Sequence, residues 1–213
     1  MKNDLAYHNL LQAFAKGCPI CILINQNTTR LIDDLLYERV NDSLTRDRIR
    51  ESFGFCNRHA WQLQTAGDVS GHSIIYADLL TTLAELFASR KVNQRALKPK
   101  RICLVCEQEQ EVEREYTAKL IKYFHDSKLQ NRYSESAGLC LPHIYQVIAQ
   151  TKDAKLHAEL LAIEKLKFLA LSEELKRLLN TYDYRFTKTQ LGKERDAWIR
   201  AIEKLSGRRG VRP

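Results

Sequence analysis

Six cysteines and two histidines of this sequence recur as pairs whose spacing is typical of metal ligands. Each pair has two intervening residues, as in Cys18-Pro19-Ile20-Cys21. Donors three positions apart on a turn or a helix lie on one side, so both can bind one tetrahedral ion. The eight candidate ligands are Cys18, Cys21, Cys56, His59, Cys103, Cys106, Cys140 and His143.

The four pairs form an internal repeat. A Cys-x-x-Cys at 18–21 is followed by Gly-x-Cys-x-x-His at 54–59, and the same two motifs return at 103–106 and 138–143. Each copy offers three thiolates and one imidazole, which fill the coordination sphere of zinc. We expect each copy to form its own site, the simpler assumption, although pairing across the copies is also compatible with the sequence.

Other uses of clustered cysteines fit the pattern less well. A disulfide framework would leave one of three cysteines in each copy unpaired and the histidines unexplained. A c-type haem site needs a histidine directly after the second cysteine, where Ile22 and Glu107 stand. A thioredoxin-like motif requires a βαβ context. An iron–sulfur cluster stays open as the alternative, but four cysteines are its commoner ligand set, so we predict two structural zinc ions.

Several segments resemble an uncharacterised bacterial and archaeal family of duplicated Cys-x-x-Cys and Gly-x-Cys-x-x-His proteins. They are residues 18–21, Leu36-Tyr37-Glu38-Arg39-Val40-Asn41-Asp42, 54–61 and 138–143, within a resemblance that covers about residues 5–150. The resemblance implies a cytoplasmic, helical, metal-binding protein and brings no assigned activity.

The composition and the hydrophobic spacing predict an all-α fold. Leu, Ala, Glu, Lys, Gln and Arg dominate, and no segment alternates with the period of two of a half-buried strand. We expect a duplicated helical core with two metal sites, divided as 1–99 and 100–152, whose two repeats pack as one unit. A C-terminal helical hairpin at 153–213 follows. One helix of the hairpin spans about 153–180, and the other carries Leu191, Trp198, Ile202 and Leu205 and ends at Gly207.

Polar residues near the ligands are candidates for supporting them. Glu38 and Asn41 lie late in a predicted helix and could hold a ligand from behind, while Arg58 could donate to a thiolate or face solvent. The run Glu107, Glu109, Glu111, Glu113 and Glu115 spreads around a helix and is expected to form a solvated face.

The distribution of charge along the sequence indicates which residues could bind a partner. The net charge is +8, and residues 184–213 contain nine basic and three acidic residues. Arg208, Arg209 and Arg212 in this tail could contact nucleic acid or the ribosome through phosphates, although many basic tails have no ligand. No stretch is apolar enough to cross a membrane, and the N-terminus lacks the pattern of a secretion signal. We therefore expect a cytoplasmic protein without a membrane partner, a zinc-binding interaction module rather than an enzyme; a thiol redox protein and a metal sensor are the alternatives.

Overall fold

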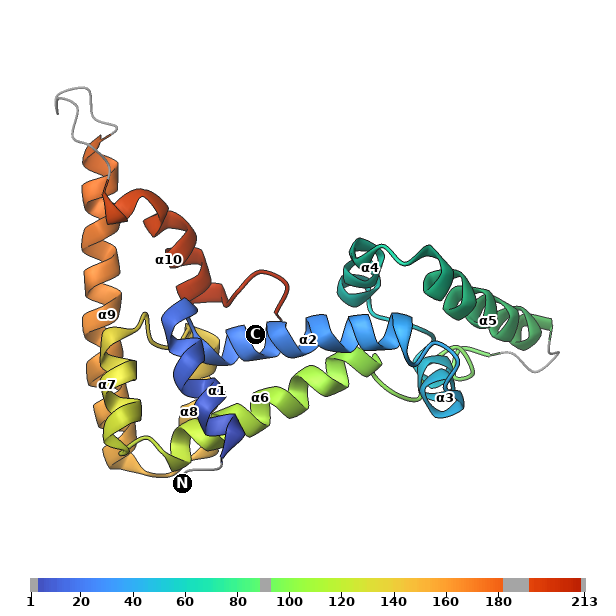
Figure 1. Ribbon diagram of the computed structural model, residues 1–213, viewed down its shortest axis with the longest axis horizontal. Coiled ribbons are helices and arrows are strands. Elements are labelled where there is room, and N and C mark those ends of the chain that lie inside the picture. The colour runs from blue at the N-terminus through green and yellow to red at the C-terminus, as the bar shows by residue number, and fades with distance from the viewer. Residues whose placement is uncertain (1–3, 89–92, 182–191, 212–213) are drawn as a thin grey trace. The chain divides into compact units, whose positions relative to one another are not determined.

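The protein is helical, as the sequence predicts. The computed structural model describes residues 4–88, 93–181 and 192–211, and these contain α-helices and short 3₁₀ turns without a strand (Figure 1). Leu191 and Arg212 lie outside the described residues. The helices are α1 (Leu5–Ala13), α2 (Pro19–Tyr37), α3 (Ser43–Glu51), α4 (Asn57–Ala66), α5 (Val69–Ala88), α6 (Leu104–Lys122), α7 (Ser127–Glu135), α8 (Leu141–Gln150), α9 (Ala154–Thr181) and α10 (Ala197–Ser206).

Among the described helices, aspartate side chains cap the starts of α1, α3, α5, α7 and α9. The carboxylate of Asp42 accepts a hydrogen bond from the backbone of Thr45 at the start of α3. Asp126 does the same for α7, the helix at the equivalent place in the second repeat. Asp4 caps α1. Each cap satisfies a backbone N–H that has no partner within the helix, so local sequence sets where these helices begin.

The chain divides into two compact units that do not follow the repeat. Unit 1 contains residues 1–25 and 113–213, and unit 2 contains residues 26–112. The division of the sequence at residues 99 and 152 stays a prediction about the repeat. Two long helices, α2 and α6, each contribute residues to both units.

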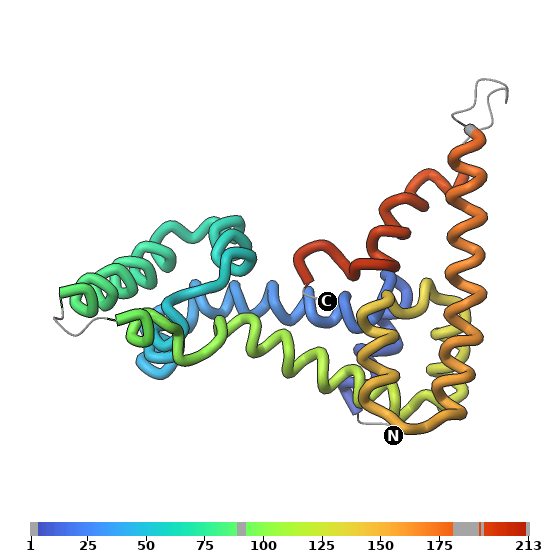
Figure 2. Tube along the Cα trace, turned by 180° about the vertical axis from the view of Figure 1, so that it is seen from behind, coloured from blue at the N-terminus to red at the C-terminus, as the bar shows by residue number. Residues whose placement is uncertain are grey.

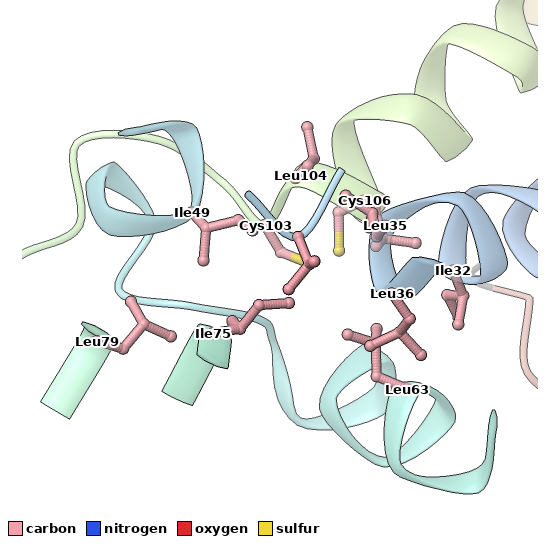
Figure 3. Packing of buried hydrophobic residues seen from close by; sticks show 12 residues of the cluster. Ile32, Leu35, Leu36, Ile49, Leu63, Ile75, Leu79, Cys103, Leu104 and Cys106 are labelled. Atoms are coloured by element: carbon pink, nitrogen blue, oxygen red, sulfur yellow. The ribbon is translucent and has the colours of Figure 1, made fainter. Parts of the chain in front are cut away.

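Unit 2 is built around one apolar cluster that includes metal-ligand candidates (Figure 3). Leucines and isoleucines of α2, α3, α4 and α5 bury their side chains against the start of α6, where Cys103 and Cys106 lie. The apolar residues of this cluster are Ile32, Leu35, Leu36, Val40, Ile49, Leu63, Ile75, Leu79, Leu104 and Val105. Burial of these side chains brings the two cysteines into the core.

Unit 1 has a core with more aromatic side chains. The ring of Tyr133 meets those of Phe14 and Phe124 edge to face, with centroids 5.5 and 6.0 Å away. The predicted C-terminal hairpin belongs to this unit: α9 and α10 lie side by side (Figure 2). Arg200 of α10 pairs with Glu174 of α9 at 2.5 Å. The hairpin therefore packs on the rest of unit 1 and forms part of its core.

Candidate metal centres

The eight predicted ligands gather into two groups, each with three thiols and one imidazole. Site 1 consists of Cys18, Cys21, Cys140 and His143, and site 2 consists of Cys56, His59, Cys103 and Cys106. Each Cys-x-x-Cys thus meets the Cys-x-x-His of the other repeat. The expectation that each repeat forms its own site is wrong. The reason is the length of α2, which carries the chain about 24 Å from Cys21 to its end at Tyr37 before the chain turns.

Every ligand pair lies on the first turn of a helix. In the Cys-x-x-His pairs, Cys56 is the N-cap of α4 and Cys140 is the N-cap of α8. In the Cys-x-x-Cys pairs, the first cysteine directly precedes α2 or α6, and its carbonyl accepts the first bond of that helix. The second donor of each pair follows three residues later on the same turn. Each site therefore lies at two helix N-termini, whose positive ends favour thiolates.

The donor atoms have the separations that one tetrahedral ion requires. Zinc–sulfur and zinc–nitrogen bonds of ordinary length give sulfur–sulfur edges of about 3.8 Å and sulfur–nitrogen edges of about 3.5 Å. The Sγ atoms of Cys21 and Cys140 in site 1 lie 3.6 Å apart, as do those of Cys56 and Cys106 in site 2. Nδ1 of each histidine lies between 3.0 and 3.5 Å from the sulfurs of its site. All four donors of a site lie within 4.8 Å of one another, so the residues fit a single ion.

A glycine two residues before each Cys-x-x-His pair has a left-handed backbone. The φ angle is +94° at Gly54 and +74° at Gly138. Side chains are disfavoured in this region, and a Cβ at Gly138 would stand 2.3 Å from Oε1 of Glu164. The repeated Gly-x-Cys spacing therefore reflects a turn that points the following cysteine toward the site.

Each histidine directs its second nitrogen at a carboxylate. Nε2 of His59 lies 3.1 Å from Glu109, and Nε2 of His143 lies 3.2 Å from Glu113. A carboxylate at this position fixes the ring and favours the tautomer whose Nδ1 binds metal. Both glutamates come from α6, where we expected a solvated face. That expectation is wrong for Glu109, which is 6% exposed.

A local signal for these carboxylates was present in the sequence. Glu109 and Glu113 follow Cys106 by three and seven positions, on the face of α6 that continues from the ligand. The alternation of five glutamates concealed this spacing.

Arg58 acts on site 2 through Glu109. Its guanidinium donates to both carboxylate oxygens, and Thr28 donates to Oε1 at 3.0 Å. The sequence offered a thiolate or solvent as the partner of Arg58, and the structure instead places it on the glutamate behind His59. The other two predicted supporting residues, Glu38 and Asn41, are both exposed, and the structure brings neither to a ligand.

Hydrogen bonds within the donor sets shift the pKa values of both histidines and of Cys18. Burial lowers the pKa of His59, but hydrogen bonds with Cys103 and with a glutamate outweigh burial and raise it to about 9. Burial also lowers the pKa of His143, and bonds with two thiols and a glutamate raise it to about 12. Burial raises the pKa of Cys18, yet hydrogen bonds from the other donors of site 1 bring it well below its usual value. A bound cation would replace the protons that bridge these donors.

The basic tail is described only in part. Arg208 is half-buried and Arg209 is exposed, and nucleic-acid contact through these residues stays a prediction. Among the described helices, none is long and apolar enough to cross a membrane.

Comparison with known proteins gives a family without an activity. The profile of a family of unknown function (DUF6062) matches residues 1–211. An "Uncharacterized 23.9 kDa protein in xynA 3'region" of Caldicellulosiruptor sp. (strain Rt8B.4) is 34% identical over 197 residues, which cover 89% of this chain and 95% of the relative. No solved structure matches the chain significantly. The predicted resemblance to an uncharacterised family is confirmed.

Proposed function

This chain belongs to that family of unknown function, and from its two donor sets we propose that it is a zinc protein with one structural ion in each compact unit. The observation that carries the proposal is the pair of complete sites, each with three thiols, one imidazole and a carboxylate on the second nitrogen of the imidazole. Soft thiolates combined with imidazole at tetrahedral separations select zinc among the common biological metals.

The completeness of the donor sets favours a structural role. Four protein donors leave no position for water or a substrate, whereas a catalytic zinc keeps one position open. Two ions of this kind stabilise the folded state directly, because the unfolded chain does not offer the preformed site. We therefore propose a non-enzymatic interaction module whose metal ions hold its helices in place.

The compactness of the sites supports one ion over an iron–sulfur cluster. Two sulfurs bound to one ion are separated by at most twice the bond length, about 4.6 Å for zinc. A cluster interposes further iron and sulfide atoms between its cysteines, which must then lie farther apart. The sulfurs of Cys21 and Cys140, and those of Cys56 and Cys106, lie 3.6 Å apart, inside the limit for one ion.

The membership of all six cysteines in the two donor sets supports a reducing compartment. All six are free thiols in the structure. Thiolate sites persist where glutathione and thioredoxin keep cysteines reduced, so we place the protein in the cytoplasm as part of the proposal.

Elemental analysis and an absorption spectrum of anaerobically purified protein test the metal. We expect two equivalents of zinc per chain and no visible absorption band. A brown protein that contains iron and acid-labile sulfide would overturn the proposal and establish the redox alternative. Protein that folds fully without any metal would also overturn it.

A further inference from the structure

A cavity of about 620 Å³ in unit 1 reaches the metal ligands of site 1. Three of its lining residues are Cys18, Cys21 and Cys140, and Cys18 is only half-buried. Cavities of about 300–1,000 Å³ are the usual size for binding small molecules. A molecule in this cavity would lie against the sulfurs of site 1.

The wall of the cavity opposite the cysteines comes from the C-terminal hairpin. It includes Lys167 and Ala170 of α9 and Arg200 and Lys204 of α10. In the first repeat α5 follows α4 as α9 follows α8, whereas α10 has no counterpart there. The part of the cavity wall that α10 supplies is therefore specific to site 1.

Buried polar contacts join the loop before Cys140 to the C-terminal hairpin beside the cavity. Glu164 of α9 accepts hydrogen bonds from the hydroxyl of Tyr133, from the backbone of Leu139 at 2.8 Å and from Lys204 at 2.6 Å. Lys204 also donates to the carbonyl oxygen of Ala137 at 2.6 Å. These bonds fix the loop before Cys140 against the hairpin. A small molecule in the cavity would meet site 1 at Cys18, the one donor of the site that is not buried.

The carboxylate oxygen that faces the histidine accepts fewer hydrogen bonds at site 1 than at site 2. Oε1 of Glu109 receives Arg58 and Thr28 in addition to the imidazole of its site. Among the described residues, Oε1 of Glu113 has no hydrogen-bond donor other than the imidazole of His143, 3.2 Å away. Each imidazole itself contacts three sulfurs and one carboxylate, so the difference between the sites lies in the oxygen behind the ring.

We propose that site 1 exchanges its metal ion through this cavity with small thiols or amino-carboxylates, while site 2 retains its ion. Such molecules offer sulfur or paired nitrogen and oxygen donors that can replace a cysteine. Cys18, the half-buried donor, is the first to leave, and its sulfur takes up a proton from solvent as the incoming donor takes its place. The inference rests on the proposed zinc function and adds to it that the two ions differ in lability.

Metal release from the zinc-loaded, full-length protein tests the inference. The chelating dye 4-(2-pyridylazo)resorcinol reports released zinc, and N-ethylmaleimide with mass spectrometry reports which thiols become free. We expect two phases of one equivalent each, separated by about tenfold or more in rate, because exchange through an open cavity needs no unfolding. Cys18, Cys21 and Cys140 should be alkylated in the fast phase.

A single release phase, or a fast phase that frees Cys56, Cys103 and Cys106, would overturn the inference while leaving the zinc proposal intact. Protein without bound zinc would instead overturn the proposed function itself. The two failures are therefore distinguishable.

Filling the cavity provides a second test that leaves all ligands in place. Ala170→Trp adds an indole at the cavity wall, and we expect the fast phase to slow about tenfold while the slow phase is unchanged. Ala162→Trp is the matched control, because Ala162 is exposed on the same helix and does not line the cavity. Equal rates in the two variants would contradict a route through the cavity.

Discussion

The two metal sites have the same donors but are supported by different parts of the chain. In site 2 the carboxylate of Glu109 is held by Arg58 and Thr28, all within the repeated core. In site 1 Oε1 of Glu113 faces no described donor but the imidazole of His143, and the loop that precedes Cys140 is fixed by Glu164 of the C-terminal hairpin. The two sites thus share their donors and motif spacing, while the contacts around them differ.

The repeat itself shows where the divergence lies. With the offset of 85 residues between the Cys-x-x-Cys motifs, Ile24 is the equivalent of Glu109 and Thr28 is the equivalent of Glu113. The helix α2 therefore contributes no carboxylate, and α6 supplies one to each histidine. Ile24 is buried, so an apolar core contact has taken the place of an acidic one.

Replacing one thiol of a site should lower the stability of the protein more than any other change proposed below. The same replacement tests whether the donors pair across the repeats. We expect Cys21→Ser to lose the ion of unit 1 and Cys106→Ser to lose the ion of unit 2. The affected unit then loses about 10–16 kcal/mol of apparent zinc-binding free energy. Hydrogen exchange should show lost protection in α8, and retained protection in α4, for Cys21→Ser. Cys106→Ser should give the reverse. Loss of protection in α4 when Cys21 is replaced would indicate pairing within the repeat.

Breaking the ion pair between Glu164 of α9 and Lys204 of α10 should lower the stability of unit 1 alone. Glu164→Gln leaves Lys204, whose side chain is 8% exposed, buried without its counter-charge. Breaking one side of a buried pair costs about 3–5 kcal/mol, which urea unfolding of the zinc-loaded protein would measure.

Glu173→Gln on the same helix is the control for this variant. Glu173 pairs only at the surface with Lys176 and should leave the unfolding midpoint unchanged. A midpoint for Glu164→Gln equal to that of the control would show that the hairpin does not support site 1.

Replacing each carboxylate behind a histidine should separate the two sites by affinity. We expect Glu113→Gln to weaken zinc binding at site 1, and Glu109→Gln to weaken it at site 2, by about 10–100-fold each. The loss should be larger at site 2, because Arg58 also loses its charged partner. Competition with a chelator of known affinity measures both constants. A variant that weakens both sites equally would show that each carboxylate does not serve one histidine.

We expect the smallest effect on stability from replacing Tyr7 of α1, a helix of unit 1. Burial, with a hydrogen bond to Asp126, raises the pKa of Tyr7 to about 12. A raised pKa means that this contact stabilises the fold fully below pH 10, the ordinary value, and that the stabilisation is lost as pH rises toward 12. Tyr7→Phe should remove the step near pH 12 from a titration of tyrosinate absorbance, and should leave the later step of Tyr133, whose pKa burial raises well above its usual value. An unchanged step near pH 12 would assign it to another tyrosine.

Much of the site could be predicted because its chemistry is local. The eight donors follow from residue type and spacing, since positions three apart on a first helical turn point the same way. Helix starts at Asp42 and Asp126 follow from capping, and the long C-terminal helix follows from its leucine spacing. Glu109 and Glu113 were missed although they lie at helical spacing from Cys106, because alternating glutamates are also typical of an exposed face.

By itself, the sequence determined an all-helical chain with a duplicated set of thiols and imidazoles. Only the tertiary structure decided which donors share a site, because α2 is long enough to carry the chain out of unit 1 before Cys56 is reached. The tertiary structure also decided that Glu164 and Lys204 lie beside site 1, because burial of the hairpin brings together residues that are distant in sequence. Contacts within one helical turn are set locally, whereas contacts between turns depend on where each helix ends and packs.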